Sequence, residues 1–192
     1  MAKLATVTIT GVSPYSPGKH YSEIEAPKLD KESFADYEAR TWRNRMHVKD
    51  GKVQIPPMAF KNCLSEAAKY LSIRIPGKGQ ATYTKHFTAG VLVSEPLTLP
   101  VKAADVPGNW LFVPADGVRG SGKRVNKCFP LIEEWGGTVN FQIFDETVTE
   151  KIFTQVLREA GMLVGIGTFR PINNGYFGRF AVDKVKWGDL KF

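Results

Sequence analysis

The chain has 192 residues, of which 43% are hydrophobic, and this is enough for one sizeable core. Its formal net charge of +7 favours an anionic partner, with nucleic acid as the first expectation. No apolar run of about 18 residues occurs, so we expect no membrane-spanning helix, and the N-terminus lacks the apolar segment of a secretory signal. The cysteines and histidines show no metal-ligand spacing, and single thiols suit a reducing compartment. We therefore expect a cytoplasmic protein with neither metal nor cofactor.

The first quarter of the chain begins with a strand pattern and continues into a charged segment. Residues 5–11 alternate apolar and polar side chains, which predicts a half-buried strand. Residues 19–49 are rich in charge and poor in aliphatic side chains, and we expect a surface insertion with some helix between residues 32 and 45. The pair Asp50-Gly51 then predicts a tight turn.

A first apolar helix is predicted after this turn. It begins at Pro56-Pro57, its apolar residues recur on one face from residue 58 to residue 71, and Gly77 and Gly79 are expected to end it. Residues 80–136 predict a second surface insertion, with short strands at 89–96 and 110–114 between proline-rich turns.

The last third of the chain repeats the pattern of strand, helix and strand. Residues 137–144 alternate cleanly, and the spacing of Thr147 and Glu150 predicts a capping box at the start of a helix that Gly161 ends. A last strand is expected at 179–187. The strongest elements thus predict a single α+β domain over 1–192. We expect a ferredoxin-like (RRM-type) split βαβ core, with a basic insertion between the first helix and the later strands.

The segment before the last strand combines glycine, arginine and aromatic residues, and no acidic residue occurs between Ala160 and Val182. Glycine allows close approach of a backbone to a ligand, arginine binds phosphate, and aromatic faces accept stacked bases. A glycine-rich turn that only reverses the chain is the alternative. The expected nucleic-acid contacts in this loop are Gly165, Gly167, Phe169, Arg170, Gly175, Tyr176, Phe177, Gly178 and Arg179.

Three further groups of cations are expected at the same interface. Lys61 is expected on the first turn of the first apolar helix, where phosphate is favoured, although a solvated lysine fits as well. Arg40 and Arg43 lie in a basic run around Trp42, for which a solvated helix face is nearly as good an interpretation. The third group is an acid-free segment with Arg119, Lys123, Arg124 and Lys127.

Two stretches resemble motifs of the RAMP superfamily of CRISPR-associated proteins. Residues 50–64 resemble a strand ending in Ile-Pro-Gly, followed by two small residues and a lysine-containing helix start, although Pro57 and Asn62 depart from the glycines of that pattern. Residues 165–180 resemble the glycine-rich loop of the superfamily. The resemblance implies a subunit of the guide-RNA-coating backbone type, in which residues 80–130 would form a hairpin that reaches across RNA. A phage or mobile-element protein that uses the same fold is the alternative.

Enzymatic interpretations are weaker. Gly117, Gly122 and Lys123 have P-loop spacing, but Arg124 stands where a magnesium-binding hydroxyl is needed, so we reject ATP binding. The glycine-rich loop also fails the dinucleotide fingerprint. Among RAMP-like nucleases a histidine acts as general base, and His20 with Tyr15 and Lys19 would be the candidates here.

We expect no catalysis, and no motif distinguishes Asp30 or Asp36 as a cleaving aspartate. The function expected from the sequence is binding of single-stranded RNA, or single-stranded DNA, by a head-to-tail homo-oligomer within a ribonucleoprotein for antiviral defence, next to other effector subunits. The alternatives are a metal-independent endoribonuclease, a phage single-strand-binding protein, and a protein-interaction subunit.

Overall fold

The computed structural model describes residues 1–118, 120 and 122–191. An antiparallel sheet with the strand order β4 (Val91–Val93), β8 (Gly136–Ile143), β1 (Lys3–Gly11) and β9 (Phe180–Asp189) forms its centre. The alternation expected for the first strand is confirmed, since Ala5, Val7 and Ile9 point into the core and the threonines between them face outwards.

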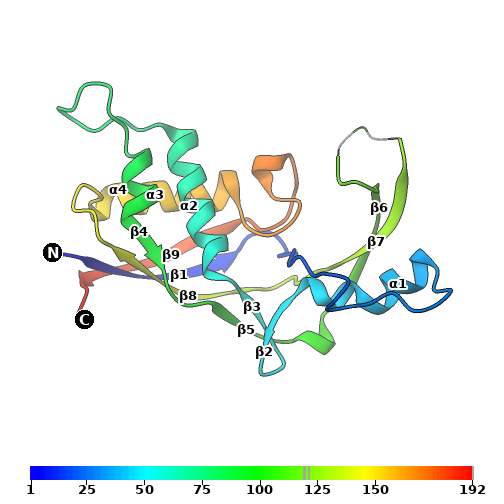
Figure 1. Ribbon diagram of the computed structural model, residues 1–192. Helices are drawn as coiled ribbons and strands as arrows, with labels where there is room; N and C mark the ends of the chain where they lie inside the picture. Colours follow the sequence, from blue (N-terminus) through cyan, green and yellow to red (C-terminus); the bar gives the residue numbers. More distant parts are fainter. Residues whose placement is uncertain (119, 121, 192) are drawn as a thin grey trace.

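Three helices lie together on one side of this sheet (Figure 1). They are α2 (Pro57–Leu71), α3 (Thr84–Gly90) and α4 (Glu150–Glu159). Aromatic pairs hold the two layers together: Phe153 of α4 packs 5.3 Å from Phe141, and Phe60 of α2 packs 6.2 Å from Phe180, between ring centroids. Helices on one face of antiparallel strands are what the predicted α+β class requires.

A second sheet contains β2 (His47–Lys49), β3 (Lys52–Ile55) and β5 (Leu97–Lys102), with β3 in the middle. Asp50 and Gly51 join β2 to β3 with φ angles of 51° and 74°, so the predicted tight turn is confirmed. Helix α1 (Phe34–Thr41) precedes this sheet and continues into a 3-10 turn, Trp42–Arg45, inside the range expected for helix.

Strands β6 (Gly108–Pro114) and β7 (Arg124–Pro130) pair only with each other and form a ribbon that stands away from the main sheet. Figure 1 shows this ribbon at the opposite end of the molecule from both termini. A 3-10 turn, Ala103–Asp105, leads into β6, and another, Pro171–Asn173, lies within the glycine-rich loop. The ribbon is the part of the fold that corresponds to the hairpin expected within residues 80–130.

Three expected helix ends were wrong. Helix α2 ends at Leu71 with Ser72 in the left-handed region, well before Gly77. Helix α4 is capped by Thr149, whose side chain accepts from the Ile152 amide, while Thr147 donates its amide to Asp145. Beyond α4 the backbone continues through a wider turn, Ala160–Val164, and ends at Gly165 with φ 69°. Gly161 is instead required for packing, because a Cβ there would clash with the carbonyl oxygen of Phe180.

Both segments expected as surface insertions also build the interior. Trp42 and Met46, from residues 19–49, are buried. In residues 80–136, α3 was not expected at all, Phe87 on it is fully buried, and β4 forms an edge strand of the main sheet. No helix in the described ranges is long and apolar enough to cross a membrane.

Candidate nucleic-acid interface

The glycine-rich loop, residues 165–178, is held against the loop that follows β1. The Thr168 amide donates to the Ser16 carbonyl at 2.8 Å, the Gly178 amide donates to the Pro14 carbonyl at 2.8 Å, and the Arg179 amide donates to the Ser13 hydroxyl at 3.0 Å. These bonds make one continuous surface from two segments that lie more than a hundred residues apart in the chain.

The glycines of this loop are needed for contact with the protein's own backbone. Gly167 has φ 82°, and a Cβ on it would meet the ring of Tyr15 and the Ser16 carbonyl. A Cβ on Gly175 would clash with the carbonyl group of Phe169, and one on Gly178 with that of Ile166. The amides of Gly165, Gly175 and Gly178 all donate to protein carbonyls, whereas the Gly167 amide has no acceptor among the described residues. Among these four glycines, Gly167 is therefore the one whose N–H has no partner within the described residues.

The N-terminus of α2 lies beside Gly167. Helix α2 starts after Pro56, and no side chain caps its first turn. Met58 and Asn62 of that end line a shallow pocket of about 270 Å³ together with Gly167, Lys19 and His47. An uncapped helix start next to a free loop amide and a cation is an arrangement that favours an anion.

Lys19 connects this pocket to the neighbouring surface. Its backbone amide donates a hydrogen bond to the Arg45 carbonyl at 2.9 Å. Its side chain lines the pocket at Gly167, a second hollow that reaches Lys127 on the ribbon, and a third that reaches Arg43. We call this surface the Lys19 groove, defined by Lys19, Arg43, His47, Lys127 and Gly167. Glu25 is the acidic side chain that reaches Lys19, at 3.4 Å.

His47 is the titratable ring of the groove. Burial first, and then the charge of Lys19, lowers its pKa below the ordinary histidine value. It is therefore neutral at neutral pH. The sequence suggested His20 as the partner of Lys19 and Tyr15, but the structure places His47 in the pocket with them and His20 in the next hollow. Tyr15 is buried, and burial raises its pKa.

A buried ion pair holds the base of the ribbon. Arg45 contacts both carboxylate oxygens of Glu38, at 2.8 and 3.1 Å, and Glu38 also accepts the Cys128 amide of β7 at 2.7 Å. The Arg45 guanidinium lies 5.3 Å from the ring centre of Phe129. Sequence reasoning missed Glu38, because a carboxylate within a charged segment gives no sign that it is only 2% exposed.

Aromatic side chains join the ribbon to the glycine-rich loop. Phe129 packs edge-on against Phe169 at 4.9 Å, Phe169 lies 6.2 Å from Phe177, and Phe177 lies 5.8 Å from Tyr176. Phe169 has φ 52°, a conformation that non-glycine residues seldom adopt. Phe169 and Phe177 are thus engaged in packing, while Tyr176 at 63% exposure presents an accessible ring.

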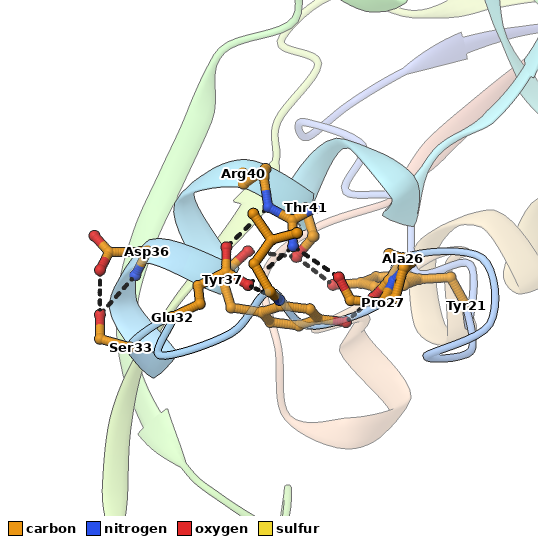
Figure 2. Close-up of polar contacts among 10 residues, drawn as sticks. Tyr21, Ala26, Pro27, Glu32, Ser33, Asp36, Tyr37, Arg40 and Thr41 are labelled. Carbon is orange, nitrogen blue, oxygen red and sulfur yellow. Dashed lines mark hydrogen bonds and ion pairs between the residues drawn. The ribbon is translucent and has the colours of Figure 1, made fainter.

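Arg40 fastens the loop before α1, as Figure 2 shows. Its guanidinium binds both oxygens of Glu32, at 2.8 and 2.9 Å, and donates to the Pro27 carbonyl. The Ser33 hydroxyl donates a hydrogen bond to the Asp36 carboxylate at 2.6 Å and accepts one from the Asp36 amide at 3.1 Å, so Ser33 caps the start of α1. These contacts give Arg40 and Asp36 structural partners.

Three more predicted cations also have partners within the protein. The Lys61 ammonium donates to the carbonyls of Phe87 and Thr88, each at 2.7 Å, and burial lowers its pKa. It is the fifth residue of α2, not part of the first turn as expected. Arg170 pairs with Glu66 at 2.9 Å, and Arg179 donates to the Tyr176 carbonyl at 3.0 Å.

Of the remaining predicted cations, Arg43 and Lys127 line the groove, whereas Lys123 and Arg124 lie at the far end of the ribbon, where Arg124 pairs with Pro114. Arg43 stacks over Trp42 at 4.1 Å, Lys127 donates to the Ala115 carbonyl, and Arg124 lies 5.7 Å from the ring centre of Phe112. Lys123 is exposed and directly precedes β7. Arg119 lies outside the described residues. No group of three potential metal ligands occurs in residues 1–118, 120 and 122–191.

Comparison of the fold with solved structures finds Cmr6 from Pyrococcus furiosus, with a TM-score of 0.50 and 14% sequence identity over 95% of this chain and 99% of that chain. A chain of a CRISPR RNA-guided surveillance complex aligns over 96% of this chain and 68% of its own, but its TM-score of 0.39 and 9% identity are too low to support an argument. No family model matches the sequence, and no curated protein does. The likeness to Cmr6 establishes a shared fold.

Proposed function

We propose that this protein is an RNA-binding subunit of RAMP type that holds a single strand in the Lys19 groove. The observation that carries the proposal is the convergence of the uncapped α2 N-terminus, the free Gly167 amide and Lys19 on one pocket, which continues towards the ribbon. Phosphates would lie at Gly167 and Lys19 and continue towards Arg43 and the ribbon cations. Tyr176 would offer its exposed ring to a base.

The RAMP assignment has two supports. Residues 50–64 and 165–180 resemble the superfamily motifs, and both now border the same pocket. The fold that the chain shares with Cmr6 from Pyrococcus furiosus is the second support. A ferredoxin-like core is part of this proposal, and the strand order β4-β8-β1-β9 with α2 and α4 on one face supports it.

The backbone-subunit role is the finer part of the proposal. The strands of the β6–β7 ribbon pair with neither of the other sheets, and in this proposal the ribbon would contact a neighbouring copy on the same strand, so that copies would follow one another head to tail. Such a ribonucleoprotein would be cytoplasmic and would include other effector subunits.

The groove can be tested with a charge-removing pair of substitutions. Lys19→Gln with Lys127→Gln should weaken binding of a fluorescent 20-nucleotide RNA, and the slope of log affinity against log salt should become smaller by about 1, since two phosphate contacts are lost. The matched control, Lys28→Gln with Lys151→Gln, removes the same charge away from the groove and should leave both quantities unchanged. Equal binding by the two variants would refute the groove as the site.

A second candidate function is metal-independent cleavage of a structured RNA. The observation that favours it is the neutral His47 ring in the same pocket as Lys19, a combination that can accept a proton and stabilise a phosphate charge. Incubation with hairpin RNA in EDTA separates the two functions. A discrete product that His47→Ala abolishes would support cleavage, and intact RNA would leave binding alone.

A further inference from the structure

A second basic surface lies at the other end of α2. No acidic residue occurs between Glu66 and Glu95, and this stretch includes the last turn of α2, the hairpin of residues 72–83 and helix α3. Its four exposed cations are Lys69, Arg74, Lys78 and Lys85. None of them forms an ion pair with any residue in the described part of the chain.

The hairpin that carries two of these cations is an ordered structure. The Ile75 amide donates to the Ala81 carbonyl at 2.8 Å, and the Tyr83 amide donates to the Ile73 carbonyl at 3.1 Å. Ile75 is buried and anchors the base. Gly77 and Gly79 take positive φ angles on either side of Lys78, so the tip presents a lysine on a tight glycine turn. Figure 1 shows this hairpin projecting beyond the helices.

An aromatic ring accompanies the charges. Tyr70 follows Lys69 in the last turn of α2 and is 62% exposed. Cations interleaved with an exposed aromatic ring are typical of surfaces that bind single-stranded nucleic acid through phosphates and stacked bases. An unpaired cluster of like charges has an unfavourable self-energy that an anionic polymer relieves.

We propose that this surface, which we call the Lys78 surface (Lys69, Tyr70, Arg74, Lys78 and Lys85), is a second binding site for the sugar-phosphate backbone of single-stranded nucleic acid. It lies one helix length from the Lys19 groove, because the groove adjoins the N-terminus of α2 and the hairpin follows its C-terminus. Fifteen residues at about 1.5 Å each separate the two surfaces by about 22 Å. That distance exceeds the Debye length of roughly 10 Å at 0.1 M salt, so the two surfaces act as separate sites.

The test compares the wild type with two triple variants on long single strands. Arg74→Gln with Lys78→Gln and Lys85→Gln should weaken binding of a 40-nucleotide oligouridylate by about tenfold. Its salt slope should become smaller by about 2, because three phosphate contacts are lost. A control triple, Lys28→Gln, Lys151→Gln and Lys191→Gln, has the same net charge and should bind like the wild type. Oligothymidylate should show the same loss as oligouridylate, since the contacts are to phosphate.

Tyr70→Ala provides a second variant that leaves the charge unchanged. It should weaken binding of the single strand and leave binding of a duplex of equal length unaltered. All substituted side chains are exposed, so thermal unfolding of the variants should match that of the wild type.

The outcome is independent of the groove proposal. The first outcome is that the variant with Arg74→Gln, Lys78→Gln and Lys85→Gln (the Arg74 triple) has the same affinity and the same salt slope as the control triple. The proposal of the Lys78 surface is then refuted, even when Lys19→Gln with Lys127→Gln loses binding. If the Arg74 triple loses affinity while the groove variant does not, the Lys78 surface stands and the groove fails.

Discussion

Single side chains decide how the charged insertion of this protein is held together. Glu38 is the clearest case, because its carboxylate is buried between Arg45 and the Cys128 amide. Residue patterns predict exposed charges well, but they do not reveal which member of a charged run turns inward. Arg40 and Lys61 were expected to contact nucleic acid, and Arg45 lies in the same basic run as Arg40, yet each has a protein partner in the structure.

Removal of Glu38 should leave the Arg45 guanidinium, whose side chain is only 14% exposed, without a counter-charge. We expect Glu38→Ala to lower the free energy of unfolding by about 3–5 kcal/mol, as is usual when one partner of a buried pair is deleted. Urea unfolding measures this loss. Glu133→Ala, an exposed carboxylate elsewhere, should change stability by no more than about 0.5 kcal/mol. A loss for Glu38→Ala as small as that of the control would mean that the pair does not hold the ribbon base.

The Glu32–Arg40 pair makes a pH-dependent contribution. Hydrogen bonds from Arg40, and then from the Leu29 amide, lower the pKa of Glu32 from 4.5 to about 2. Because the folded-state pKa lies below the unfolded one, the stabilisation is complete above about pH 5 and is lost as the pH falls towards 2. The difference in Tm between the wild type and Glu32→Gln should therefore be largest near neutral pH and shrink in acid. A difference that stays constant from pH 7 to pH 2 would contradict this.

At the scale of elements, the sequence predicted those helices, strands and turns that local residue patterns determine. The alternation in β1, the Asp50-Gly51 turn and the presence of α2 and α4 follow from periodicity and turn residues. The helix ends could not be predicted in the same way. Gly161, for example, is required by packing against Phe180 and does not end the helix. Helix α3 was missed for a similar reason: its segment is short, and Phe87 is held by the core it enters.

The glycine-rich loop gives an element-scale prediction. Gly167→Ala would force a left-handed backbone on alanine and press its Cβ against Tyr15 and Ser16, so stability should fall by roughly 1–3 kcal/mol and RNA affinity should fall with it. Gly188→Ala is the matched control, because its Cβ would meet no atom within 4 Å and its φ is unexceptional. Thermal unfolding and an RNA titration of both variants provide the comparison. Equal stability and equal RNA affinity of the two variants would contradict this prediction, because they would show that the loop tolerates a shift away from Tyr15.

At the scale of the whole molecule, the candidate site depends on contacts between distant segments. Gly167, Lys19 and His47 come from three parts of the chain, and hydrogen bonds between the glycine-rich loop and the β1 loop bring the first two together. The sequence identified the loop and its charge but not Lys19 as the centre of the candidate groove, because the pocket forms only when the two loops pack together. The basic stretch between Glu66 and Glu95 was visible in the sequence, yet its accessibility depends on the hairpin fold.

The central claim is that this protein binds single-stranded RNA along a chain of copies. The most direct measurement is size-exclusion chromatography of protein purified without nuclease, with the absorbance ratio at 260 and 280 nm recorded across the peak. We predict a large species rich in nucleic acid that collapses to a small one after ribonuclease but not after deoxyribonuclease. A small species with a protein-like ratio, which also fails to bind added RNA at low salt, would contradict the account.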